Sequence, residues 1–289
     1  MFSSILTAGG LMAALGALLS SLLAFANKKL YVYEDPRIDA VEELLPRANC
    51  GACGLAGCRA FAEAAVQGKI SPGKCTVSSH EAVEEIGALL GVMANREEKK
   101  TARLACAGGR HVAKFRARYQ GIPSCRAATV VSGGGKGCVW GCLGLGDCKD
   151  VCDFGAIEMD RHGLPVVDPA KCVACGACVD ACPKKLFSIH PISHRLWVAC
   201  KSRARGDEAE SQCEVACTAC GRCAMDAPAG LVAIKDNLAA VDYEKNALAT
   251  PAVIQRCPTG AIVWLDDKGA VKGAAAKKIL RKEPLPVGR

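Results

Sequence analysis

The N-terminal segment is apolar without interruption and predicts a membrane-spanning helix. Residues 2–26 carry no charged side chain, and Lys28 and Lys29 follow directly. A helix of this length measures about 37 Å, enough to cross a hydrocarbon core of about 30 Å. Because positive charges follow the span and none precedes it, we expect a single pass through the inner (cytoplasmic) membrane, with the rest of the chain on the cytoplasmic side.

A cleaved signal peptide is the alternative for this segment. Such peptides carry a basic region ahead of the apolar core, and residues 1–4 provide none, so we expect a retained anchor. Gly9, Ala13 and Ala17 recur at every fourth position. This spacing would let another membrane helix approach closely, although any alanine-rich helix can show it.

Beyond the anchor, the apolar pattern predicts one amphipathic helix and several short strands. Apolar residues recur at helical spacing from Ala82 to Met93 within the segment 80–105, and a charged stretch follows at 97–100. Short apolar runs at 155–159 and 186–189 each come after a cysteine-rich stretch. Each such stretch is therefore expected to form a loop, a short helix and a strand.

The cysteines, twenty in 289 residues, carry the chemistry. The clearest run is C-x2-C-x2-C-x3-C-P, ending at Pro183, in which three thiolates bind one [4Fe-4S] cluster and the fourth binds a second cluster. A looser run precedes it, with Asp153 where proline is usual. The crossed-ligand rule predicts one cluster on Cys138, Cys142, Cys148 and Cys182, and another on Cys152, Cys172, Cys175 and Cys178.

A second, degenerate copy of this arrangement follows. Ala227 stands where a fourth cysteine is due, and counting back from Cys257 reaches no ligand. The frame from Asp168 to Cys172 recurs from Asp242, but with Asn246 in place of the cysteine. One cluster of the pair is therefore expected to be lost, and the other to be bound by Cys217, Cys220, Cys223 and Cys257.

The N-terminal cysteines form a further pattern, C-x2-C-x4-C, with a fourth cysteine after sixteen intervening residues. Glycines 51, 54 and 57 interleave the first three thiols and would let the backbone fold closely around an inorganic core. We expect a fourth cluster here, on Cys50, Cys53, Cys58 and Cys75.

Four cysteines belong to no motif. They are expected to be single buried thiols, with a fifth cluster as the alternative, and they are Cys106, Cys125, Cys200 and Cys213. Iron analysis would separate the two cases, because four clusters contain about sixteen iron atoms and five contain about twenty.

Disulfides and zinc are the competing interpretations of the cysteines. Crowded C-x2-C-x2-C triplets suit disulfide geometry poorly, and the expected compartment is reducing. Zinc accepts four thiolates equally well, but the crowded third and fourth thiols of the run ending at Cys182 favour a pair of clusters. With only 13 aromatic residues, the domains are expected to depend on metal clusters for stability.

Charge and the remaining motifs exclude several classes of function. The formal charge is +8, but a cluster with four thiolates carries about −2, so four clusters would nearly neutralise the chain. The basic runs lack interleaved aromatic residues, which argues against nucleic-acid binding. The glycine-rich segment 132–137 misses the phosphate-loop spacing, no dinucleotide motif follows a strand, and the five histidines occur in no ligand spacing.

Two segments together resemble a known family. The first is Asn49-Cys50-Gly51-Ala52-Cys53-Gly54-x-x-Gly57-Cys58-Arg59-x-Phe61-Ala62, which is preceded by Glu34-Asp35-Pro36-Arg37. The second is the segment 138–148, which is similar to the longer form of this family's sequences. The chain resembles the B subunit of Rnf complexes, membrane-bound ion-translocating ferredoxin:NAD oxidoreductases. The resemblance implies an electron-transfer subunit of a translocase. It would take electrons from soluble ferredoxin and relay them through [4Fe-4S] clusters to flavin- and NAD-binding and multispanning partner subunits, which move Na+ or H+.

The resemblance also implies cluster ligands and leaves some positions outside the family pattern. For the N-terminal cluster and the ferredoxin-like pair it implies the cysteines named above, with Cys138 completing the pair in the longer form. The departures are Ala227, Asn246, the triplet missing before Cys257, and Arg110 where a further cysteine is expected. A polyferredoxin subunit of another membrane oxidoreductase, or a zinc-stapled membrane-tethered scaffold, remains the alternative.

The expected fold is α+β: one N-terminal transmembrane helix, a small [4Fe-4S] domain, and tandem ferredoxin-like domains of the βαβ type. The expected boundaries are 1–29 for the anchor, 30–92 for the [4Fe-4S] domain, 93–132 for a helical and basic linker, 133–192 for a ferredoxin-like domain with two clusters, 193–266 for a degenerate domain with one, and 267–289 for a basic tail.

Overall fold

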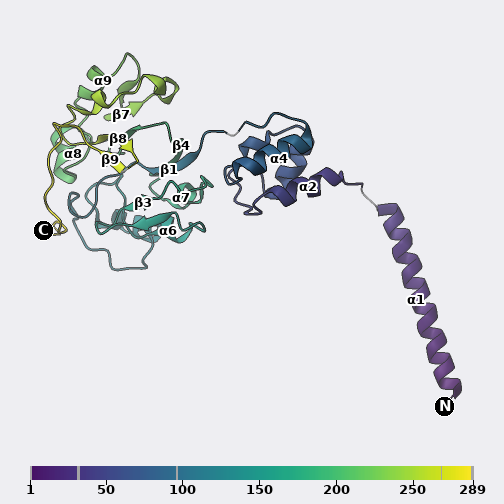
Figure 1. The fold of residues 1–289 in the computed structure, drawn as a ribbon. Helices are drawn as coiled ribbons and strands as arrows, with labels where there is room; N and C mark the ends of the chain where they lie inside the picture. Colours follow the sequence, from purple (N-terminus) through teal and green to yellow (C-terminus); the bar gives the residue numbers. More distant parts are fainter. Residues whose placement is uncertain (1, 31–32, 96, 268, 288–289) are drawn as a thin grey trace.

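The computed structural model of the protein describes residues 2–30, 33–95, 97–267 and 269–287, and it mixes helices with short strands. Figure 1 shows helix α1 (Phe2–Leu30) projecting away from the rest of the chain. The small helical group α2 to α4 comes next, and a larger body contains the strands and the C-terminal segment.

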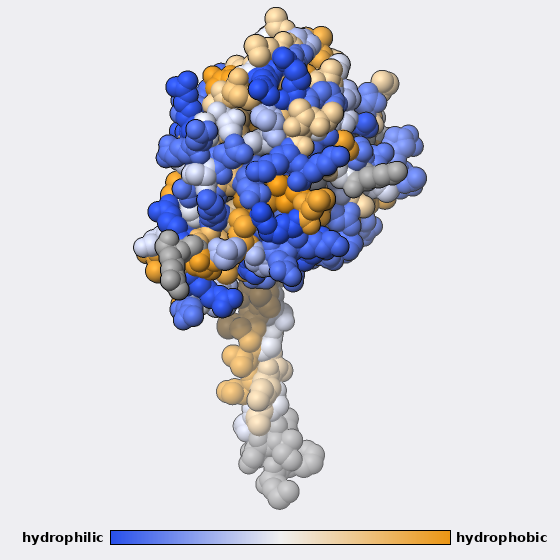
Figure 2. All heavy atoms as spheres, turned by 90° about the vertical axis from the view of Figure 1, so that its left-hand side faces the viewer, coloured by the Kyte–Doolittle hydropathy of each residue, from blue (hydrophilic) through white to orange (hydrophobic). Residues whose placement is uncertain are grey.

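Helix α1 has the length and composition of a membrane span. Its segment Thr7–Leu30 is long and apolar enough to cross a bilayer, and no other described part of the protein covers it. Figure 2 shows this apolar rod below a largely hydrophilic body. A signal sequence at the same place would have the same composition, but the exposed Leu22, Leu23 and Phe25 need a covering that the described part of the chain does not supply.

The helical group consists of α2 (Pro36–Leu44), α3 (Cys58–Val66), the short 3-10 helix η1 (Pro72–Lys74) and α4 (His80–Leu90). The Ser79 hydroxyl accepts a hydrogen bond from the amide of Ala82 at the start of α4, and Gly91 ends the helix in the left-handed conformation. The amphipathic helix predicted after residue 80 is therefore confirmed up to Leu90. Val41, Phe61 and Ile86 form the core of the group.

The first strand-containing unit spans residues 100–191. Strand β1 (Lys100–Leu104) pairs antiparallel with β4 (Phe187–Pro191), and β2 (Ile157–Met159) pairs with β3 (Pro165–Val167). The helices of this unit are α5 (Cys125–Val130), η2 (Ser132–Gly135), α6 (Asp147–Asp150) and α7 (Ala177–Ala181). Both strands predicted after the cysteine runs are present, as β2 and β4.

The second unit repeats this strand pairing. Its first strand, β5 (Leu196–Val198), pairs with its late strand β8 (Ile262–Asp266), and β6 (Val232–Lys235) forms a hairpin with β7 (Leu238–Val241). Its helices are α8 (Gly206–Gln212), α9 (Arg222–Asp226), η3 (Tyr243–Leu248) and η4 (Pro251–Ile254), and β9 (Gly269–Val271) extends the sheet. The two units therefore have one topology.

The strand pairing shows how each of the expected strand-and-helix domains is closed. Every strand pair among the described residues is antiparallel. The order strand, helix, strand occurs in each half of the first unit, as β1, α6 and β2 and as β3, α7 and β4, but the two strands of one half do not pair with each other. Each unit instead closes by pairing its first strand with a late one, β1 with β4 and β5 with β8.

Two segments expected to lie outside the cluster domains belong to the body. Residues 100–104, in the expected linker, form β1 and lie next to β4, almost 90 residues later. The basic C-terminal segment contains β9, and Arg281 donates to the carbonyl oxygen of His111 and pairs with Glu214. Both segments connect to distant residues, which local sequence patterns do not reveal.

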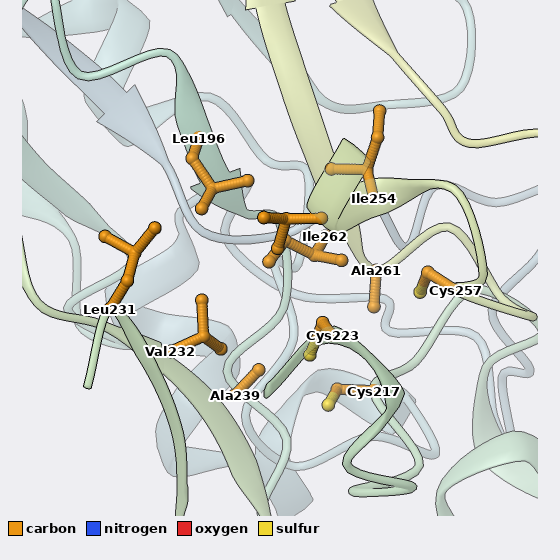
Figure 3. Packing of buried hydrophobic residues seen from close by; sticks show 11 residues of the cluster. Leu196, Cys217, Cys223, Leu231, Val232, Ala239, Ile254, Cys257, Ala261 and Ile262 are labelled. Carbon is orange, nitrogen blue, oxygen red and sulfur yellow. The ribbon is translucent and has the colours of Figure 1, made fainter. Parts of the chain in front are cut away.

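Where the second unit lacks its expected ligands, apolar side chains fill the space. Val253 and Ile254 are fully buried, and Ala227 and Ala249 pack against the same cluster. Figure 3 shows Leu196, Leu231 and Ile262 packed beside Cys217, Cys223 and Cys257. The second half of the unit is therefore stabilised by a hydrocarbon core at this place.

The two units meet at a buried arginine. Arg103 on β1 donates to the carbonyl oxygens of Pro191, Ile192 and His194 and lies 5.8 Å from the centre of the Trp197 ring. His190 beside it hydrogen-bonds with Ser188 and His194. Burial, with smaller effects of His194 and Arg103, lowers the pKa of His190 to about 4, so its ring is neutral at pH 7.

Replacing Arg103 by methionine is expected to destabilise the junction of the two units. Arg103 is 8% exposed, and removal of its guanidinium leaves three partly buried carbonyl groups without this donor. Hydrogen bonds to charged groups contribute about 1.5–3 kcal/mol each, and their effects overlap, so we expect a loss of about 3 kcal/mol. Anaerobic denaturant unfolding should measure it. The exposed Arg195 changed to methionine provides the control, and an equal loss in both variants would contradict this role.

Candidate functional site: five groups of four cysteines

All twenty cysteines are free thiols, and the structure brings them together in groups of four. The first group is N-terminal. Burial raises the pKa of Cys50, and the nearby thiols Cys75 and Cys53 act in the same direction. Cys53, Cys58 and Cys75 share one hydrophobic cluster. These four cysteines are therefore neighbours, as the sequence predicts.

The backbone around the first group explains the glycine spacing of its loop. Gly51 and Gly54 have φ angles of 68° and 87°, which side chains rarely adopt. A Cβ atom on Gly57 would lie 2.8 Å from the side-chain oxygen of Asn49, and that same oxygen accepts a hydrogen bond from the amide of Cys58. The loop therefore needs glycine at all three positions.

The second group lines a pocket in the first unit and consists of the predicted set Cys152, Cys172, Cys175 and Cys178. The amide of Ala102 donates to the sulfur of Cys172 over 3.5 Å, and the amide of Ala156 donates to Cys152 over 3.4 Å. Such N–H···S hydrogen bonds are a feature of iron–sulfur sites, where they tune the reduction potential.

The third group differs from the prediction by one residue. Its pocket is lined by Cys125, Cys142, Cys148 and Cys182, so Cys125 takes the place expected for Cys138. Asp147, next to Cys148, accepts hydrogen bonds from the amides of Cys125 and Arg126 and from the Ser124 hydroxyl. Although burial alone would raise the pKa of Asp147, these donors lower it. The carboxylate thereby holds Cys125 in place.

The fourth group lies in the second unit and consists of the predicted set Cys217, Cys220, Cys223 and Cys257. Cys220 is exposed, whereas the other three thiols are buried. Figure 3 shows the three buried cysteines gathered on one side of the apolar cluster. The pocket opens beside them and is lined also by Ile234, Ala239 and Ile262.

The remaining cysteines form a fifth group. Cys138, displaced from the third pocket, lines one pocket together with three of the cysteines that fit no motif, Cys106, Cys200 and Cys213. The sequence motifs missed this grouping because its members lie in four separate segments. A signal existed in the repeat: Cys106 and Cys200 each follow the first strand of a unit by two residues.

The chemistry of these groups fits iron–sulfur clusters better than single ions. No group of three or more His, Cys, Asp or Glu side chains within residues 2–30, 33–95, 97–267 and 269–287 could hold one metal ion. Zinc–sulfur bonds are about 2.3 Å long, so zinc would need the thiols closer together. Four of the five groups each line a pocket with four cysteines.

The thiols need a metal to become ligands. Burial raises the pKa of Cys142, Cys148 and Cys178 to about 12. At neutral pH these thiols are protonated without metal, and cluster binding must release their protons. The bound clusters would supply one-electron redox centres, while the protein sets their potentials through burial and N–H···S hydrogen bonds.

Comparisons with known proteins agree with this chemistry. Residues 45–77 match the family described as "Putative Fe-S cluster", and residues 137–186 match the family described as "4Fe-4S dicluster domain". The first match contains the first group of cysteines, and the second contains Cys138 and the seven cysteines from Cys142 to Cys182. The protein is therefore an iron–sulfur protein.

Three relatives resemble the chain over most of its length. The B subunit of the Na(+)-translocating ferredoxin:NAD(+) oxidoreductase complex of Acetobacterium woodii is 39% identical over 91% of this chain and 78% of its own length. The B subunit of the ion-translocating oxidoreductase complex of Methanosarcina acetivorans is 38% identical over 91% of this chain and 99% of its own length.

The third relative is the B subunit of the proton-translocating ferredoxin:NAD(+) oxidoreductase complex of Clostridium ljungdahlii, which is 37% identical over 87% of this chain and 89% of its own length. All three alignments cover at least 87% of this chain. The chain belongs to the family of B subunits of ion-translocating ferredoxin:NAD oxidoreductase complexes, the Rnf family.

Proposed function

We propose that this chain is the electron-transfer subunit of a membrane-bound Rnf-type complex. It accepts electrons from soluble ferredoxin and passes them to partner subunits that bind flavin and NAD and to multispanning subunits that move Na+ or H+. The observation that carries the proposal is the line of cysteine groups from the first unit to the N-terminal group, which follows the anchor in the chain. The tandem ferredoxin-like domains belong to the same proposal, with the expected ranges 133–192 and 193–266 extended to include β1 and β9.

Contacts between neighbouring segments support this line. The hydroxyl of Thr76, next to Cys75, donates to the carbonyl oxygen of Val173, next to Cys172, over 2.9 Å. The segments that carry the first and second cysteine groups therefore touch directly. The amide of Glu97 also donates to the carbonyl of Gly73, which holds the loop of Cys75 near the start of the first unit.

The anchor keeps the first group near the membrane. Cys50 follows Leu30 by twenty positions, and an extended chain of this length reaches at most about 70 Å. Lys28 and Lys29 favour the cytoplasmic side for everything that follows. In this arrangement the groups of the two units face the cytosol and its soluble ferredoxin, and the first group faces the membrane partners.

The chain itself needs no acid, base or nucleophile for this role. Its side chains hold the clusters, exclude water from them and place N–H groups against the thiolates. Four clusters follow from the first four cysteine groups, with Cys50, Cys53, Cys58 and Cys75 nearest the membrane.

Reduction by ferredoxin tests the proposal. The full chain, purified without oxygen, is expected to be brown and to lose visible absorbance when mixed with reduced ferredoxin. Oxidised ferredoxin provides the control and should change nothing. Colourless protein that contains zinc would support the scaffold alternative and refute the proposal. Brown protein that dithionite bleaches but reduced ferredoxin does not would refute ferredoxin as the donor and favour a polyferredoxin of another oxidoreductase.

A further inference from the structure

We propose that Cys106, Cys138, Cys200 and Cys213 bind a fifth [4Fe-4S] cluster, shared equally by the two strand-containing units. The inference rests on the proposed function and extends it, because it adds a redox centre that links the two units. The four cysteines line one pocket and are contributed by loops that lie up to 107 residues apart in sequence.

The repeat of the fold places these cysteines at equivalent positions. Cys106 follows β1 by two residues, and Cys200 follows β5 by two residues. Cys138 precedes Cys142 by four residues, and Cys213 precedes Cys217 by four residues. Each unit therefore contributes the same pair of ligands, and the pocket lies where the two units meet.

Hydrogen bonds around the pocket repeat in the same way. The amide of Cys142 donates to the sulfur of Cys106 over 3.4 Å, and the amide of Cys217 donates to the sulfur of Cys200 over 3.3 Å. The amide of Ser202 also donates to Cys200 over 3.4 Å. This arrangement matches the N–H···S bonds of the second cysteine group, and lone buried thiols do not require it.

A buried lysine indicates that the pocket takes a negatively charged occupant. Lys136 lines the pocket and is 4% exposed, and its ammonium group donates to the carbonyl oxygens of Gly108 and Cys142 over 2.5 and 2.6 Å. In the part of the chain that the structure describes, no carboxylate pairs with it. A buried charge without a counter-ion is costly, and a cluster with four thiolates would supply about two negative charges.

The backbone is fitted closely around the thiols. A Cβ atom on Gly108 would lie 3.1 Å from the sulfur of Cys213 and 3.6 Å from the sulfur of Cys106. A side chain at this position would therefore displace the sulfur of Cys213 by a few tenths of an ångström, whereas the contact with Cys106 is of ordinary length. Like the pockets of the second, third and fourth groups, this pocket is lined by four cysteines.

The position of the pocket gives the fifth group its role. The sulfur of Cys106 accepts a hydrogen bond from the amide of Cys142 in the third group. The sulfur of Cys200 accepts one from the amide of Cys217 in the fourth group. The fifth group thus lies between the cysteines of the first unit and those of the second. It completes the line, so that the fourth group is connected to the pair and, through Thr76, to the N-terminal group.

Metal and sulfide analysis of the full chain, purified without oxygen, tests the inference. The wild-type chain is expected to contain about twenty iron atoms and twenty sulfides, and the variants Cys138→Ala and Cys200→Ala about sixteen of each. Ser211→Ala, an exposed position two residues before Cys213, is the matched control and should keep twenty. About sixteen iron atoms in the wild-type chain, or one zinc ion in addition to sixteen, would overturn the inference and leave the proposed function intact.

The variant Lys136→Met provides a second measurement if the cysteine variants do not fold. It removes a positive charge from this pocket and from beside Cys142 of the third group, so the reduction potentials of both clusters should become more negative in an anaerobic titration followed by electron paramagnetic resonance. Its iron content should remain near twenty. A shift confined to the coupled pair of the first unit would contradict a cluster in this pocket. A chain without iron would refute the proposed function itself.

Discussion

Replacing Cys53 by serine is expected to reduce ferredoxin-driven NAD reduction by the assembled complex to the rate of a complex that lacks this chain. Cys53 belongs to the N-terminal group, which lies nearest the anchor and contacts the first unit through Thr76 and Val173. Loss of its cluster interrupts the line between the cytosolic groups and the membrane partners. Steady-state NADH formation, measured with the purified complex, checks the expectation.

The control for this experiment separates a broken electron path from a damaged chain. In the Cys53→Ser complex, reduced ferredoxin should still bleach the clusters of both strand-containing units. Glu85→Ala, an exposed change in the same helical group, should leave NADH formation unchanged. Wild-type turnover in the Cys53→Ser complex would show that electrons reach the partners by another route.

Replacing Cys125 by alanine is expected to remove the cluster of the third group. The structure places Cys125, and not Cys138, with Cys142, Cys148 and Cys182, and Asp147 holds it there through the Ser124 hydroxyl and two amides. The variant should lose about four iron atoms and the magnetic coupling between the two clusters of the first unit. Iron analysis and electron paramagnetic resonance measure both effects.

The same experiment distinguishes the two assignments of Cys138. If Cys138 completed the pair, Cys125→Ala would keep its iron and its coupled signal, and Cys138→Ala would lose the coupling. With the arrangement in the structure, Cys138→Ala retains the coupled pair and loses the fifth cluster. Arg126→Ala, an exposed change beside Cys125, is the matched control and should alter neither measurement.

The sequence motifs predicted local structure well. Each cysteine run was expected to form a loop, a short helix and a strand, and α7 with β4 and α9 with β6 have this order. The amphipathic pattern after His80 marks α4, and the left-handed Gly91 ends it where the pattern meets a turn. The loss of ligands near Asn246 predicted one cluster fewer, and buried Val253 and Ile254 fill that region.

Strand β1 is an element that the sequence patterns did not predict. Its sequence, Lys-Thr-Ala-Arg-Leu, alternates weakly and lies in a segment expected to be a linker. Its stability comes from pairing with β4 and from the carbonyl groups that Arg103 binds at the far end of the unit. The pairing partners of β1 lie almost 90 residues away, so its own alternation of apolar and polar residues predicts the strand only weakly.

The sequence by itself determined that this is an anchored, thiol-rich electron carrier of the Rnf family, because ligand spacings within one loop and an uncharged span of 25 residues are local properties. Only the tertiary structure decided which distant cysteines meet. Cys125 and Cys138 lie 13 residues apart, yet they line different pockets. Asp147, in α6, accepts a hydrogen bond from the amide of Cys125, whereas Cys138 lies at the junction of the two units. Ligand sets assembled across a repeat depend on how its two copies pack.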